Sequence, residues 1–387
     1  MEGPRMEAVL VGKGYSSISS CEWQEEVSET LWFTYRCGFA EMVPYGLTDD
    51  AGWGCMLRSS QMLMAKALCR HLSGRRNDVI RWFADAPGEE AVFSVHNMVR
   101  VGQRYDMLPG EWYGPGIAAH VLRDLAELLD EKLRIVVTSA ERPLCEEDVL
   151  DDLTRNVRCE PEIDEEVPAR DDSSVDYDPL LRPPPEQIKA KKRKIAVEAA
   201  RKKRLAAPWT ESVLILVPIR LGLNRLEAKF VEPLLRCLRF PQSIGFVGGR
   251  PRQALYFVGA ANADLVGLDP HVVQPSPGLG PGLLSEKHLD SLVCRSPRFV
   301  PAHAIDPSLA LGFYCRTRED FLRFLQLAAD LKSYSDPPLF DVLKTYGDPP
   351  PNVVLDDDDD EDALNDDDRR RRRRLTEDDE DDDYVVV

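Results

Sequence analysis

The spacing of apolar residues predicts helices in the first part of the chain and again near its end. Ser59–Leu72 places leucine, alanine and methionine on most sides of a helix, which indicates an element buried on nearly all faces. Ile117–Leu133 repeats the helical period with charges between its apolar positions, and the β-branched run Arg134–Thr138 that follows predicts a strand. Similar helical spacing occurs in Lys229–Leu238 and Asp320–Leu331.

Short apolar runs separated by glycine and proline predict a strand-rich second half. Val213–Ile219 is continuously apolar, as expected of a strand buried on both faces. Further strands are predicted at Ser243–Gly249, Ala254–Gly259, Asp264–Leu268 and Ala310–Cys315. Helices first and consecutive strands later indicate an α+β domain with segregated elements.

A long charged segment separates the two halves. Acidic residues accumulate from Glu141 to about Asp178 without apolar periodicity, and a basic, alanine-rich stretch follows at Lys189–Arg204. Because such a long loop is unusual inside a compact domain, we expect residues 141–207 to be an insertion in a domain spanning 21–350. The basic stretch matches a nuclear-localisation or nucleic-acid patch, but the acids upstream favour a solvated helix.

The two ends of the chain differ from this domain. Residues 1–20 are small and polar, which predicts a flexible arm. The chain carries a formal charge of −18, and residues 352–387 hold 17 acids against six arginines. Self-repulsion and the lack of apolar residues predict a disordered acidic tail over 351–387. This charge balance predicts no nucleic-acid partner.

The remaining composition narrows the class of protein. The sequence contains no apolar run long enough to span a membrane and no secretory leader, so we expect a cytoplasmic protein. Nine cysteines without a C-x-x-C pair predict reduced thiols and neither metal nor cofactor. A single cysteine can still act as a nucleophile.

The most informative cysteine is Cys55. It follows Gly-Trp-Gly and immediately precedes the predicted helix Ser59–Leu72. Unpaired N–H groups and the positive dipole end at a helix N-terminus stabilise a thiolate. The alternative, a buried and inert cysteine, stays open on spacing alone.

A cysteine nucleophile needs a base and a group that orients the base. Among six histidines, His271 differs from the rest because it stands two residues after an acid, Asp269, at the end of a predicted strand. Side chains two apart share one face of a strand, so the pair can interact. An ordinary strand-ending turn is the alternative.

Eight segments in order then resemble one family, the autophagins, which are papain-like cysteine proteases. The likeness covers about residues 28–346 apart from the insertion, and is carried by Leu31–Arg36, Trp53–Arg58, Glu111–Pro115, Pro218–Leu223, Pro241–Gly245, Gly248–Pro251, Gly267–His271 with Gln274, and Asp306–Cys315. The resemblance implies a papain-like fold, with the nucleophile's helix packed on a mostly antiparallel sheet. It also implies Cys55 as nucleophile, His271 as base and Asp269 as its partner.

The resemblance extends to substrate and groove. It implies cleavage of the autophagy ubiquitin-like modifier after a C-terminal glycine, and removal of that modifier from phosphatidylethanolamine, which gives transient access to autophagic membranes. Tyr35 would complete an oxyanion hole, although a core aromatic is an equal interpretation. Trp112 with Gly248 and Gly249 would line the groove, although Trp112 also fits a core anchor. A catalytically weak, modifier-binding scaffold is the competing function.

The acidic tail ends in an apolar cluster, residues 384–387. An aromatic, two residues and an aliphatic behind acids resemble the motif by which proteins dock on the autophagy modifier. Tyr384 and Val387 would fill two pockets as the tail adds a strand to the modifier's sheet. The alternative is a tail that only maintains solubility.

Overall fold

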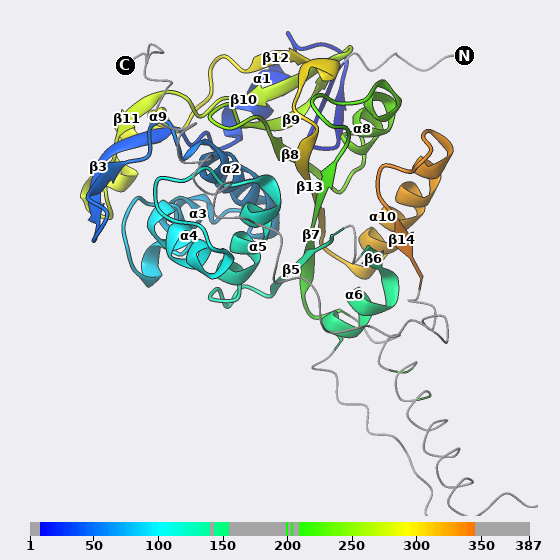
Figure 1. The fold of residues 1–387 in the computed structure, drawn as a ribbon, viewed down its shortest axis with the longest axis horizontal. Helices are drawn as coiled ribbons and strands as arrows, with labels where there is room; N and C mark the ends of the chain where they lie inside the picture. The colour runs from blue at the N-terminus through cyan, green and yellow to red at the C-terminus, as the bar shows by residue number, and fades with distance from the viewer. Residues whose placement is uncertain (1–7, 140–142, 155–198, 200–202, 204–208, 345–387) are drawn as a thin grey trace, which may run out of the picture.

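A nine-stranded sheet forms the centre of the molecule (Figure 1). The computed structural model describes residues 8–139, 143–154, 199, 203 and 209–344. The strands run in the order β12-β10-β9-β8-β13-β7-β5, with β1 and β2 added beside β9. Among these strands only β5 and β7 pair in parallel. Their bounds are Ala8–Leu10 (β1), Lys13–Tyr15 (β2), Leu133–Val137 (β5), Ser212–Arg220 (β7), Ser243–Gly248 (β8), Leu255–Ala261 (β9), Asp264–Leu268 (β10), Arg298–Pro301 (β12) and Ser308–Cys315 (β13).

Helices cover both faces of this sheet, so it separates two apolar cores (Figure 1). Alternation along β7 shows why: Leu214 and Leu216 belong to one core, whereas Val213, Ile215 and Val217 belong to the other. The first core contains α2 (Cys55–His71), α3 (Arg76–Trp82), α4 (Val95–Gly102) and α5 (Pro115–Ala126). The second contains α6 (Glu146–Leu153), α8 (Val231–Cys237) and α10 (Arg318–Asp330).

Two smaller sheets complete the pairing. One joins β3 (Tyr35–Met42) to β4 (Leu47–Asp49) and, in parallel, to β11 (Val273–Pro275). The other joins β6 (Leu144–Cys145) to β14 (Val342–Leu343). Short helices α1 (Cys21–Glu29) and α9 (Glu286–Ser291) lie at the same side of the molecule as β11 and β12 (Figure 1). No described helix is both long and apolar enough to cross a bilayer.

The predicted α+β class is confirmed, with shifts at two helix ends. The helix α2 begins at Cys55, four residues before the predicted start. The helix α5 ends at Ala126, although the apolar period continues to Leu133. Lys132 has a left-handed φ of 50°, and Leu133 begins β5 by pairing with β7. Sheet pairing therefore overrides the helical pattern there.

The prediction of a flexible arm over residues 1–20 is wrong for the part that the structure describes. Residues 8–10 form β1, which pairs with β9, and all three are buried. The close approach requires Gly259 on β9, where a Cβ would lie 1.9 Å from the carbonyl oxygen of Val9. The helix α1 follows, capped by the side chain of Ser20.

The predicted insertion also begins later than residue 141. The helix α6 buries Val149, Leu150 and Leu153 in the second core, and β6 pairs with β14 near the other end of the domain. Acidic residues on its outer side conceal this apolar stripe in the sequence. The rest of the insertion, apart from positions 199 and 203, and the acidic tail lie outside the described residues.

Candidate active site

Cys55 is the first residue of α2 and is completely buried. The preceding residue, Gly54, is the N-cap and provides no side-chain cap, so the first N–H groups of the helix are left for other partners. The positive end of the helix dipole therefore acts directly on the thiol. This is the position that the sequence predicts for a nucleophile.

Asp269 and His271 form the pair that their spacing predicts. Nδ1 of His271 lies 2.5 Å from Oδ1 of Asp269, and the backbone N–H of His271 donates to the same oxygen at 3.0 Å. The two side chains are only 23% and 14% exposed, respectively. The carboxylate thus fixes both the tautomer and the orientation of the imidazole.

The electrostatics link this pair to Cys55. Burial opposes the charged imidazolium, but Asp269 and Cys55 outweigh it through hydrogen bonding and charge, and the pKa of His271 rises to about 9. Its buried Nε2 has no partner of ordinary hydrogen-bond geometry among the described residues. The thiol therefore lies within interaction range of the imidazole without the aligned bond that a bound substrate induces.

Tyr35 lies against the same imidazole. Its ring meets that of His271 edge-to-face, with centroids 5.4 Å apart and planes at 88°. The side chain is fully buried, and the Tyr35 N–H donates to the carbonyl of Pro270 at 2.9 Å. Both predicted interpretations, core aromatic and oxyanion donor, are compatible with this place.

Two residues that the sequence did not single out support Asp269. The indole Nε1 of Trp32 donates to the Asp269 carbonyl at 2.7 Å, and Arg298 on β12 pairs with its Oδ2 at 2.5 Å. Although burial works against the carboxylate, His271 and, to a smaller extent, Arg298 lower the pKa of Asp269. Trp32 lies inside the Leu31–Arg36 motif, so that motif could have identified it as a candidate site residue. Arg298 lies in none of the motifs.

The predicted groove glycines lie at the end of the sheet from which Asp269 emerges. On β9, Leu255 pairs with Gly248 and its neighbour Tyr256 pairs with Leu268, so the turn after Gly248 and Asp269 leave the sheet at the same end. Gly249 follows at a φ of +149°, where a Cβ would lie 2.4 Å from the carbonyl oxygen of Gln253. Backbone crowding is therefore sufficient to explain that glycine.

Trp112 has features of both a core anchor and a groove residue. It lies three residues before the start of α5, is partly buried and packs against the first core, as a core anchor would. Its indole Nε1 is buried without a hydrogen-bond partner among the described residues. An indole N–H in such a place usually has a partner, so a substrate carbonyl is a suitable acceptor.

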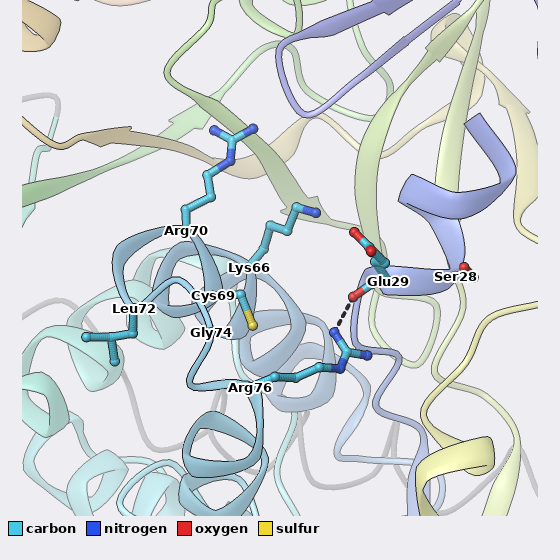
Figure 2. Close-up of a pocket in the computed structure, with 8 residues that line it drawn as sticks. All are labelled: Ser28, Glu29, Lys66, Cys69, Arg70, Leu72, Gly74 and Arg76. Carbon is cyan, nitrogen blue, oxygen red and sulfur yellow. Dashed lines mark hydrogen bonds between the residues drawn. The ribbon is translucent and has the colours of Figure 1, made fainter. Parts of the chain in front are cut away.

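A separate cavity of about 480 Å³ lies beside the other end of α2 (Figure 2). Cys69 lies between Lys66 and Arg76 there, about 20 Å along the helix from Cys55. The cations already have partners: Lys66 pairs with Glu26 at 2.7 Å, and Arg76 donates to the carbonyl of Glu29 at 2.5 Å. No histidine lines this cavity.

In the ranges that the structure describes, no three histidine, cysteine or acidic side chains gather as a metal site requires. The donor set around Cys55 consists of one thiol, one imidazole and one carboxylate. That set fits nucleophilic catalysis of acyl transfer.

Comparison with known proteins agrees with this chemistry. The model of the peptidase C54 catalytic domain matches residues 20–327. Cysteine protease ATG4B of chicken (Gallus gallus) is 33% identical over 330 residues, covering 81% of this chain and 77% of the relative. Human cysteine protease ATG4A is 32% identical over 312 residues, covering 76% and 71%. The resemblance to the autophagins is thereby confirmed, and this chain is a cysteine protease of the peptidase C54 family.

Proposed function

We propose that this protease cleaves an autophagy ubiquitin-like modifier after its C-terminal glycine and releases the same modifier from phosphatidylethanolamine. Both reactions transfer the same glycyl acyl group and differ only in the leaving amine. The observation that carries the proposal is the Asp269–His271 pair, placed within interaction range of Cys55 at the start of a helix.

Cys55, His271 and Asp269 would act in two steps. The Cys55 thiolate attacks the glycine carbonyl while imidazolium gives its proton to the departing amine, which leaves a thioester. His271 then takes a proton from water, the resulting hydroxide attacks the thioester carbonyl, and the C–S bond breaks. The acid leaves as a carboxylate after losing its proton to solvent, which restores the thiolate and the imidazolium. Asp269 orients the ring and stabilises its charged form throughout.

Tyr35 and the backbone N–H of Cys55 are the proposed donors to the oxyanion. The edge-to-face contact of the Tyr35 ring with the His271 imidazole supports this role for Tyr35. Hydrogen bonds aimed at the developing charge are worth most in a site that excludes water. No cofactor has a step in this reaction.

Trp112, Gly248 and Gly249 are proposed to line the groove for the extended end of the modifier. A glycine at the cut site suits a narrow passage, because it adds no side chain. The unpartnered Trp112 indole N–H supports a contact with the substrate backbone. Tyr384 and Val387 lie outside the described residues and stay a predicted docking motif, to be tested by deleting residues 384–387 and measuring modifier affinity.

Covalent capture tests the reaction directly. A modifier carrying a C-terminal electrophile should label the wild-type protein at Cys55 and should leave Cys55→Ala unlabelled. Cleavage of precursor and of lipid-linked modifier should disappear in the same variant. Binding of the modifier without labelling or cleavage by the wild-type protein would instead support the scaffold.

A further inference from the structure

We propose that Arg36 and Asp50 are positioning residues that keep three segments of the active site in register. The segments are the start of β3 at Tyr35, the turn before Cys55, and the chain that follows His271. This inference rests on the proposed function, because those segments carry the proposed catalytic groups. Neither residue touches the reacting atoms in this assignment.

The carboxylate of Asp50 connects β3 to α2. It is completely buried, and its Oδ1 accepts the backbone N–H of Arg36 at 2.7 Å. The same carboxylate binds Arg58 on α2 through both oxygens, with Nε at 2.7 Å from Oδ2 and Nη2 at 3.0 Å from Oδ1. One rigid two-pronged contact thus fixes the helix relative to the strand that begins at Tyr35.

The backbone of Asp50 shapes the turn that delivers Cys55. Its carbonyl oxygen accepts the N–H of Gly54 at 2.9 Å and that of Trp53 at 3.4 Å. The turn also packs on the Asp50 side chain, since a Cβ on Gly54 would lie 2.4 Å from Oδ2. The glycine is therefore required by the carboxylate beneath it, and the first residue of α2 is located by Asp50.

The side chain of Arg36 extends the connection to the segment after His271. It is 2% exposed, and its Nη1 and Nη2 donate to the carbonyl of Pro275 and to Ser291 Oγ, both at 3.2 Å. Pro275 ends β11, which begins two residues after His271 and pairs in parallel with β3. Arg36 therefore binds Asp50 with its backbone and β11 with its side chain.

Stability alone is a poor explanation for these buried charges. Removing ions from water is costly, and apolar replacements of buried ion pairs are often equally stable. Fixing the register of packed segments is the better attested use of such groups. Here every hydrogen bond of Asp50 ends on a segment that borders the proposed catalytic residues.

Asp85 provides a matched control within the same cluster. It is buried and pairs with Nη1 of Arg58 at 2.7 Å. It follows α3, which carries none of the proposed catalytic residues. Asp85→Asn and Asp50→Asn therefore each remove one carboxylate that contacts the Arg58 guanidinium, but only the second changes a side chain that also contacts the turn and β3.

The test compares the two variants in the full-length protein during cleavage of precursor modifier. We expect Asp50→Asn to lower kcat by about 10²-fold, the loss expected when reacting groups move by about 1 Å, with KM close to the wild-type value. Asp85→Asn should lower the melting temperature comparably while keeping kcat. Arg36→Lys, which keeps the charge but loses the two-armed contact, should lower kcat with little change in melting temperature.

Each outcome separates this inference from the proposed function. The positioning role is overturned if Asp50→Asn and Arg36→Lys lose no more kcat than Asp85→Asn loses. If Asp50→Asn does not fold, Arg36→Lys decides. Cleavage retained by Cys55→Ala would instead overturn the proposed function, whatever the other variants do.

Discussion

A thiol and a histidine lie near each end of α2, but the surroundings of the two pairs differ. At the first residue, Cys55 is completely buried and interacts with the pair formed by His271 and Asp269. Near the other end, Cys69 is partly buried beside the cavity in Figure 2, and burial raises the pKa of its thiol in spite of nearby Arg76. Of these two histidines, His271 contacts a carboxylate, whereas the described partners of His71 are the Tyr314 hydroxyl and the Glu131 carbonyl oxygen.

This difference shows that a hollow with cations does not by itself make a reactive cysteine. The N-terminus of a helix favours a thiolate, whereas the carbonyl groups at the C-terminus disfavour one. The cations around Cys69 are held by carbonyl and carboxylate partners, so they structure the helix end. The five predictions that follow test the two ends.

The largest expected effect separates the two cysteines. Cys55→Ala should abolish turnover, a loss of roughly 10⁴-fold or more, because the proposed thioester forms on the Cys55 sulfur. Cys69→Ala should keep turnover near the wild-type level. Steady-state cleavage assays on purified, folded variants provide the measurement, and a comparable loss in Cys69→Ala would reverse the assignment of the two ends.

The histidines should differ almost as strongly. His271→Ala removes the base, whereas His71→Ala removes a side chain whose Nδ1 and Nε2 contact Tyr314 Oη at 2.9 Å and the Glu131 carbonyl oxygen at 2.5 Å. We expect the first to lose turnover and keep its fold. The second should lose stability and keep turnover, as thermal unfolding and assays of both variants can establish.

The raised pKa of His271 also predicts a pH dependence. Because the pKa rises from 6.5 to about 9, turnover should fall above about pH 9 as the imidazolium loses its proton. By linkage, its contribution to stability is complete below pH 6.5 and is lost as the pH rises through about 9. Asp269→Asn should move the alkaline limit to lower pH. If the alkaline limit of turnover does not shift in Asp269→Asn, a group other than His271 sets that limit.

A third comparison concerns stability at the far end. Arg70 donates to the Ser243 carbonyl at 2.9 Å and also to the Val11 carbonyl, which ties α2 to β8 and to the segment after β1. Arg70→Ala should lower the free energy of unfolding by about 2 kcal/mol, with kcat unchanged. Denaturant titration measures this. Arg75→Ala is the control, since its guanidinium is exposed and its loss should leave stability near the wild type.

The smallest expected effect belongs to the catalytic end. The side chain of Arg298 is 65% exposed, so its ion pair with Asp269 is screened by solvent. Arg298→Ala should lower kcat by at most about fivefold, and by less at high salt. Assays at two ionic strengths test this, and a loss as large as that of His271→Ala would place Arg298 in the reaction itself.

The local sequence determined the elements and the chemistry of each catalytic segment. Gly-Trp-Gly before an apolar helical run places Cys55 at a helix start, because glycine permits the turn and the run sustains the helix. The spacing of Asp269 and His271 predicts their contact for an equally local reason, since residues two apart share a face. These inferences need only neighbouring residues.

Tertiary structure alone decided which of these segments meet. Cys55 and His271 are 216 positions apart, so the interaction that distinguishes a nucleophile from an inert cysteine depends on how α2 packs on the sheet that contains β10. The contact of Arg298 with Asp269 likewise exists because β12 pairs with β10. Sheet pairing also places β1 beside Gly259 on β9. The small and polar residues of this segment predict a flexible arm, but its backbone hydrogen bonds to a distant strand hold it in the fold.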